Sequence, residues 1–186
     1  MFYRFWFATL CLLLPFSSAW ADKYSDTIEM FQHAGESGYF FNHSYGYAVF
    51  PSIGKGGIGI GVAHGSGRVY KQGAYVGDAT MTQLSIGLQL GGQVFSQIIF
   101  FEDRRAFDEF TSGSYELGAQ ASAVAITAGV NASATTGGST AGISSGKHDA
   151  TTKGQYYRGL AIFTIAKGGL MYEATVAGQQ FTYTPK

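Results

Sequence analysis

The residues Gly57-Ile58-Gly59-Ile60-Gly61-Val62 alternate strictly between glycine and a β-branched residue. This period of two predicts a β-strand, in which successive side chains point to opposite faces. Residues 118–130 repeat the pattern with alanine on one face, at Ala119, Ala121, Ala123 and Ala125. A strand face of such small residues cannot fill space, so another group must approach the backbone closely there. Packing inside a tightly curved sheet or small barrel explains this most simply, and a groove for an extended acyl chain is the alternative.

Most of the remaining chain also has the composition of strands. Residues 46–50 form a short strand that we expect to end at Pro51. His64-Gly65-Ser66-Gly67 is typical of a turn, so residues 68–75 are expected to return as a hairpin partner. Further strands are predicted at residues 80–90, 93–101, 156–166 and 170–177, the last two joined by a turn at Lys167-Gly168-Gly169.

Two short helices interrupt the strand pattern. Asp26 followed by Glu29 has the spacing of a helix start, and Tyr24, Ile28 and Phe31 fall on one face. The second helix is predicted over about residues 102–111. Its buried stripe is expected to consist of Ala106, Phe107 and Phe110. Two ion pairs at i,i+4 spacing are expected on its exposed side, Arg104–Asp108 and Arg105–Glu109. The sequence thus predicts an α+β fold: a strongly curved antiparallel β-sheet or partial β-barrel with two short peripheral helices.

The N-terminal residues 1–21 have the pattern of a removable signal peptide. Arg4 supplies a positive charge, an apolar run follows over residues 5–16, and Ala19-Trp20-Ala21 has the small residues of a cleavage site. The run is shorter than the roughly 20 residues that a spanning helix needs. We therefore expect a periplasmic protein, peripheral on a membrane at most. Since Cys11 lies inside this run, the mature chain would contain no cysteine.

Composition limits the remaining possibilities. The 12 Lys and Arg residues balance the 12 Asp and Glu residues, so no basic field is available to hold nucleic acid. Residues 133–154 are rich in Gly, Ser and Thr and predict a mobile loop or irregular hairpin. The chain after this loop is too short to fold alone, so residues 22–186 are expected to form a single domain.

Several motifs occur along the chain in a recognisable order. They are Tyr47-Ala48-Val49-Phe50-Pro51, Gly54-Lys55-Gly56-Gly57-Ile58-Gly59, Gly87-Leu88-Gln89-Leu90-Gly91-Gly92-Gln93, residues 107–110, Tyr115-Glu116-Leu117-Gly118-Ala119, Gly159-Leu160-Ala161-Ile162-Phe163 and Lys167-Gly168-Gly169-Leu170. As a set they resemble the SYLF (Ysc84-like) lipid-binding domains over roughly residues 28–183. The resemblance implies binding to membrane lipids, which are phosphoinositides in eukaryotic members, and to actin in the yeast relatives. The chain carries no SH3 or FYVE module, so acidic-lipid or membrane-surface binding is the part that transfers.

Catalytic motifs find no suitable setting. Gly54 to Gly59 fits G-x-G-x-x-G, but strand residues follow it where a dinucleotide site needs a helix. Gly142-Ile143-Ser144-Ser145-Gly146 fits G-x-S-x-G but lies in the low-complexity region, with His148 almost adjacent. The four histidines show no metal-ligand spacing. We therefore expect no enzyme, no cofactor and no metal.

Lipid headgroups are best bound by cations next to glycines, where backbone N–H groups also reach a phosphate. The candidates are Lys55, Gly56, Gly57, Gly59, Arg68, Lys71, Arg158 and Lys167. For each cation, an ordinary solvated charge is the alternative. The cluster Tyr39-Phe40-Phe41 suits a membrane interface, or equally the packing of the first helix on the sheet.

The expected function is therefore non-enzymatic binding of a phospholipid or membrane surface in the cell envelope. The main alternative is a structural module that binds an envelope protein and no lipid. A lipid-acting hydrolase is the third possibility.

Overall fold

The computed structural model describes residues 22–34, 36–118, 124–126 and 156–186, without the side chains of residues 88–89, 124–126 and 168–177. The predicted loop at 133–154, the motif at 142–146 and Ala119, Ala121 and Ala123 lie outside the described residues, as does the segment 1–21.

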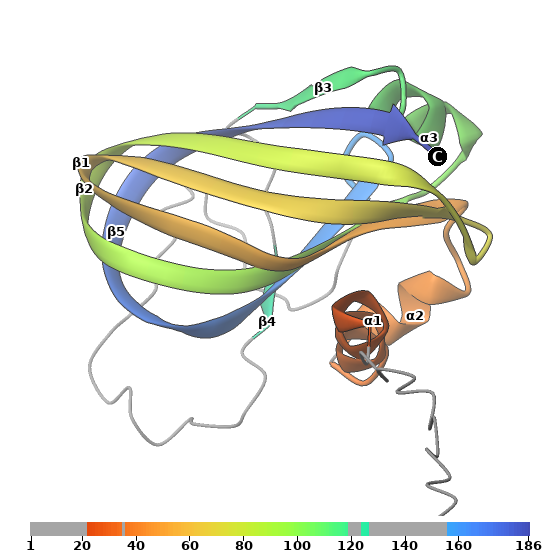
Figure 1. Ribbon diagram of the computed structural model, residues 1–186, viewed down its shortest axis with the longest axis horizontal. Helices are drawn as coiled ribbons and strands as arrows, with labels where there is room; N and C mark the ends of the chain where they lie inside the picture. Colours follow the sequence, from red (N-terminus) through yellow and green to blue (C-terminus); the bar gives the residue numbers. More distant parts are fainter. Residues whose placement is uncertain (1–21, 35, 119–123, 127–155) are drawn as a thin grey trace, which may run out of the picture.

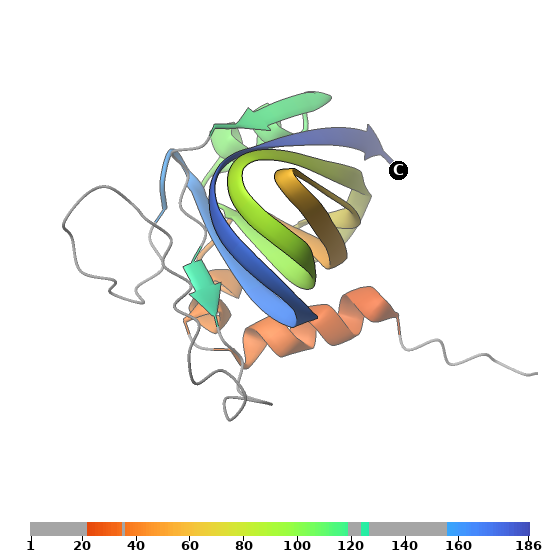
Figure 2. The same ribbon diagram turned by 90° about the vertical axis from the view of Figure 1, so that its left-hand side faces the viewer.

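Three long strands make up most of the fold: β1 (Gly46–Lys71), β2 (Ala74–Phe101) and β5 (Leu160–Pro185). All three bend sharply near their middle, and the bends nest inside one another (Figures 1 and 2). The antiparallel order is β1-β2-β5-β3, with β3 at Ser114–Leu117, and the sheet does not close. A short strand, β4 (Val124–Ile126), pairs in parallel with β5. The predicted curved antiparallel sheet of an α+β fold is confirmed.

Because the sheet bends, its inner face is buried between its own two halves. The inner core includes Phe50, Ile53, Met81, Phe95, Phe101 and Phe181, all 9% exposed or less. Burying a large apolar side chain contributes about 1.5–3 kcal/mol, so this double layer supplies most of the stability.

Two helices cover the outer face of one half of the sheet. They are α1 (Lys23–Gln32) and α2 (Ser37–Phe41), and their contacts include Phe31 and Phe40 against Phe100 and Phe163. The predicted start of α1 at Asp26 is wrong: Asp22 caps the helix, accepting a hydrogen bond from Tyr24 N. The short helix α2 was not predicted, and it buries Phe40 to 4% exposure, which favours packing as the role of this aromatic cluster.

The third helix, α3 (Arg104–Phe110), agrees with its prediction. Asp103 caps it by accepting a hydrogen bond from Ala106 N at 2.8 Å. Ala106, Phe107 and Phe110 are buried, and Arg104–Asp108 and Arg105–Glu109 form the expected ion pairs at 3.2 and 2.9 Å. Local spacing is sufficient to predict such a helix.

Three predicted strand ends are wrong. The chain passes Pro51, residues 64–67 and residues 167–169 as continuous strand. Pro51 is tolerated because β1 lies at the sheet edge and a register shift between Phe50 and Ile53 leaves Pro51 without a paired residue on β2. The hairpin turn lies instead at Gln72 and Gly73, whose φ angles of 49° and 82° suit a tight β-hairpin.

Glycines on the inner face allow the bend. A Cβ on Gly65 would lie 2.6 Å from Ile53 Cγ1, and one on Gly57 would lie 2.1 Å from the Ile60 carbonyl oxygen. Gly59 has φ of +71° beside a register shift between Ile58 and Ile60. Close packing of the sheet on itself therefore explains the glycine face of β1.

Candidate functional site

The outer face of the bend carries an exposed row of large aliphatic side chains, which we call the apolar ladder. Its members are 41–79% exposed and are Ile58, Ile60 and Val62 of β1 with Leu84, Ile86, Leu90 and Val94 of β2. Three cross-strand pairs build it: Ile58–Leu90, Ile60–Ile86 and Val62–Leu84. Directly paired residues of antiparallel strands share a face, so these side chains form one continuous surface.

The ladder has clear limits along the strands. The next outward pairs, His64–Thr82 and Ser66–Thr80, are polar. The apolar surface is therefore confined to the bend, at the end of the molecule away from α2 and α3 (Figures 1 and 2). Contiguous exposed apolar patches mark interaction sites more often than single exposed residues do.

The ladder follows from the same alternation that predicts the strand. Gly61 and Ala63 point inward and are buried, which leaves Ile60 and Val62 pointing outward. The sequence pattern identifies the two faces but does not say which one is buried. The β-branched residues would normally be expected to face the core. Here they face solvent, because a Cβ at Gly57 on the inner face would collide with the backbone of Ile60 and Gly61.

The two strands that build the ladder carry little charge at the bend. Residues 54–62 and 84–94 contain no Asp or Glu, and Lys55 is their one ionisable side chain. Lys55 is half-buried and pairs with Gln93, which in turn pairs with Gly169 of β5. Lys167 is exposed in the bulge beside this register. The structure thus brings Lys55, Lys167 and the predicted glycines Gly56, Gly57 and Gly59 to the bend, but Lys55 and Gly57 lie on the inner face with Ile53 and not on the face of the ladder.

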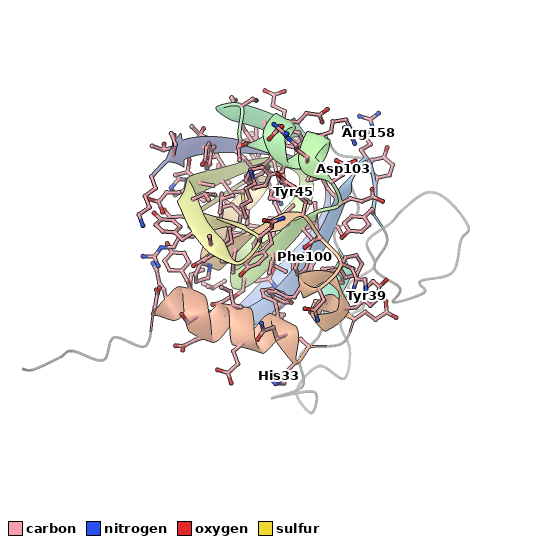
Figure 3. All side chains as sticks on the ribbon, turned by 90° about the vertical axis from the view of Figure 1, so that its right-hand side faces the viewer. His33, Tyr39, Tyr45, Phe100, Asp103 and Arg158 are labelled. Carbon is pink, nitrogen blue, oxygen red and sulfur yellow. The ribbon has the colours of Figure 1, made fainter. Side chains whose placement is uncertain are left out.

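The other predicted cations lie at the opposite end of the strands. Arg158 has a positive φ of 53° in the turn before β5, and its guanidinium lies 5.6 Å from the Tyr157 ring centroid (Figure 3). Lys71 Nζ lies 5.3 Å from the ring centroid of Tyr45. The eight predicted residues therefore do not form one site.

Arg68 has a structural partner set. It forms an ion pair with Asp22, and its guanidinium carbon lies 4.1 Å from the ring centroid of Tyr24. Burial acts to lower the pKa of Arg68, but its hydrogen bonds with Tyr70 and Asp22 and the charge of Asp22 raise that pKa overall. Arg68 thus fastens the start of α1 to β1.

A polar cluster that the sequence did not reveal crosses the interior. Gln97 Nε2 donates to Gln179 Oε1 at 3.1 Å, and Gln179 Nε2 donates to Gln83 Oε1 at 3.0 Å. Gln97 is fully buried and Gln83 is 6% exposed. Because Gln97 comes from one half of the sheet and the other two from the opposite half, these bonds fix how the halves face each other.

The histidines of the described residues are dispersed. His33 and His43 each direct Nδ1 to a backbone carbonyl oxygen, and His64 Nδ1 lies 3.3 Å from Thr82 Oγ1. Within residues 22–34, 36–118, 124–126 and 156–186, no three His, Cys, Asp or Glu side chains gather as a metal site. The helices described there are all too short or too polar to cross a membrane.

Comparisons with known proteins identify the family. The family model Ysc84, described as Las17-binding protein actin regulator, matches residues 82–183. Beta cell expansion factor A of Aeromonas veronii is 29% identical over 157 residues, which cover 83% of this chain and 51% of that protein. The chain therefore spans about half the length of this relative. No solved structure matches the chain. The family model covers more than half of the residues, and the chain belongs to the Ysc84 (SYLF) family.

Proposed function

We propose that this protein binds the surface of a lipid membrane through the apolar ladder, as a peripheral and non-enzymatic component of the cell envelope. The observation that carries the proposal is the exposure of seven large aliphatic side chains on one face of the bend. Water contact with this surface is unfavourable, and transfer into an acyl environment removes it.

The size of the effect is sufficient for reversible attachment. Full burial of one such side chain is worth about 1.5–3 kcal/mol, so burying the exposed half of each contributes about 1 kcal/mol. The ladder sums to several such contributions, against the cost of immobilising the protein on the surface. Attachment through the ladder therefore requires no membrane-spanning segment.

Lys167 adds an electrostatic contribution. It is exposed at the bulge of β5 beside the bend, where it is available to headgroup phosphates once the ladder is inserted, whereas Lys55 shares the inner face of β1 with Ile53 and Gly57. A cation near an anionic membrane surface contributes about 1 kcal/mol, so Lys167 adds less than the ladder. The proposal gives no role in lipid contact to Arg68, Lys71 or Arg158, which lie at the other end.

The test is co-sedimentation of the purified protein with phosphatidylcholine vesicles, with and without phosphatidylglycerol. The double variant Ile60→Ser with Ile86→Ser removes the centre of the ladder, and we expect it to lose most binding to both vesicle types. Tyr39→Ser is the matched control, because Tyr39 is 60% exposed, as Ile60 is, but lies on α2 away from the bend (Figure 3).

The expected effect of Lys167 is smaller and depends on charge. Lys167→Ala is expected to weaken binding to anionic vesicles and to leave binding to zwitterionic vesicles nearly unchanged. Lys55→Ala is the control, because Lys55 lies on the inner face of β1. If the wild-type protein binds neither vesicle type, the proposal is wrong and an envelope protein partner becomes the better explanation of the ladder.

A further inference from the structure

We infer that the apolar ladder recognises loosely packed hydrocarbon, as in a highly curved or defect-rich membrane, rather than a particular headgroup. This inference rests on the proposed function and names the class of lipid surface that the same site takes.

The chemistry of the ladder favours the hydrocarbon region. All seven members are Ile, Leu or Val, so none of them carries a hydroxyl or ring nitrogen that would hold a headgroup. The single ionisable side chain in the β1 and β2 parts of the bend is Lys55. Affinity must then depend mainly on how much acyl surface the membrane exposes.

The ladder is also stiff. Its β1 and β2 residues pair on both sides of the register shift between Ile58 and Ile60, and the β2 residues also pair with β5 without a shift from Gly77 to Val94. On the inner side, the bend cannot tighten freely, because Gly57 already lies against the backbone of Ile60 and Gly61. The glutamine contacts of Gln83, Gln97 and Gln179 hold the two halves together behind it.

A stiff and convex ridge needs a gap in the lipid surface. Figure 2 shows the strands curving around the bend, with the outer face turned away from the rest of the molecule. In a flat, tightly packed leaflet, headgroups must be pushed apart before aliphatic side chains reach the acyl chains. In a strongly curved leaflet the headgroups are already separated, so the same contact forms at lower cost.

The shape also argues against a second copy of the chain as the occupant. Two convex ridges meet along a narrow line, whereas a stable protein interface buries on the order of 1,200 Å² or more. A deformable lipid surface fits the ridge without this limit.

The experiment measures binding of the purified protein to small sonicated and large extruded vesicles of the same dioleoyl phosphatidylcholine composition, at equal lipid concentration. We expect several-fold tighter binding to the small vesicles. At fixed vesicle size, replacing the unsaturated chains by tightly packed saturated chains is expected to weaken binding several-fold. Ile60→Ser with Ile86→Ser is expected to abolish both differences, and Tyr39→Ser to preserve them.

The possible failures can be told apart. Binding that is equal for both sizes and both chain types, and that rises only with phosphatidylglycerol, overturns this inference and leaves the proposed function intact. Absence of binding to every vesicle overturns both. If Ile60→Ser with Ile86→Ser still binds small vesicles more tightly than large ones, another surface of the protein detects lipid packing, and the inference is also overturned.

Discussion

Phe50 and Gly67 belong to the same strand, yet they face each other across the interior of the bent sheet. A Cβ on Gly67 would lie 2.6 Å from Phe50 Cδ1 and 2.7 Å from the Val49 carbonyl oxygen. The half of β1 that contains Phe50 therefore packs directly against the backbone of Gly67, with no room for a side chain there. This contact explains why a glycine that is typical of a turn lies in the middle of a strand.

Gly67→Ala is expected to destabilise the protein by about 2–3 kcal/mol, because the added methyl group must push apart two packed layers. Urea denaturation measures the change. Gly54→Ala is the matched control on the same strand: nothing lies within 4 Å of its Cβ position, and we expect a change below about 1 kcal/mol. Equal losses of stability in the two variants would contradict the close approach of the two halves.

Arg68→Gln is expected to loosen α1 without affecting vesicle binding. The variant loses the ion pair with Asp22 and the contact with the Tyr24 ring, which together contribute about 1–2 kcal/mol. Hydrogen exchange of the α1 amides measures the loosening. Arg104→Gln, which breaks only an exposed i,i+4 pair, serves as the control. If the variant instead loses vesicle binding while the hydrogen exchange of α1 is unchanged, Arg68 contacts lipid and its proposed structural role is wrong.

Gln97→Leu is expected to lower stability by about 1–3 kcal/mol, because it leaves the half-buried amide of Gln179 without one of its partners. The urea midpoint provides the measurement. Gln93→Leu, at a half-buried position nearer the bend, is expected to cost less. If Gln97→Leu is as stable as the wild-type protein, the glutamine contacts do not fix the two halves.

Alkaline pH is expected to destabilise the protein through Tyr47. Burial, and then the neighbouring Tyr70, raise the pKa of Tyr47 from 10.0 to about 12. The folded state therefore keeps this proton when the unfolded state has lost it, so the stabilisation is full below pH 10 and disappears as the pH rises through about 12. Tyr47→Phe should lose less stability than the wild-type protein over this interval, by up to about 2 kcal/mol in urea titrations. Parallel losses in the two proteins would contradict the shift.

The part of the fold that depends on local spacing could be predicted from the sequence. The helix at Arg104–Phe110 has its buried stripe and its ion pairs within a few residues, and both are confirmed. The alternation at residues 57–62 likewise predicts a strand and the close approach of another group.

Long-range contacts could not be predicted in the same way. Gly65 and Gly67 are typical of a turn. That they lie in the middle of a strand follows only from their contacts with Ile53 and Phe50 of the same strand, which the sequence does not show. The apolar ladder was missed for a related reason, because a period of two does not say which face meets solvent. Arg68 lies beside a glycine as a phosphate ligand would, but its partner Asp22 is far away in the sequence.

The most direct test of membrane insertion is quenching of a fluorophore at the bend by lipids that are brominated in their acyl chains. The label is attached at Ile60→Cys in a Cys11→Ser background, and Tyr39→Cys on α2 provides the control position. Insertion of the apolar ladder predicts strong quenching at position 60 and little at position 39 when the protein is bound to vesicles. Bound protein with equal, weak quenching at both positions would contradict the account.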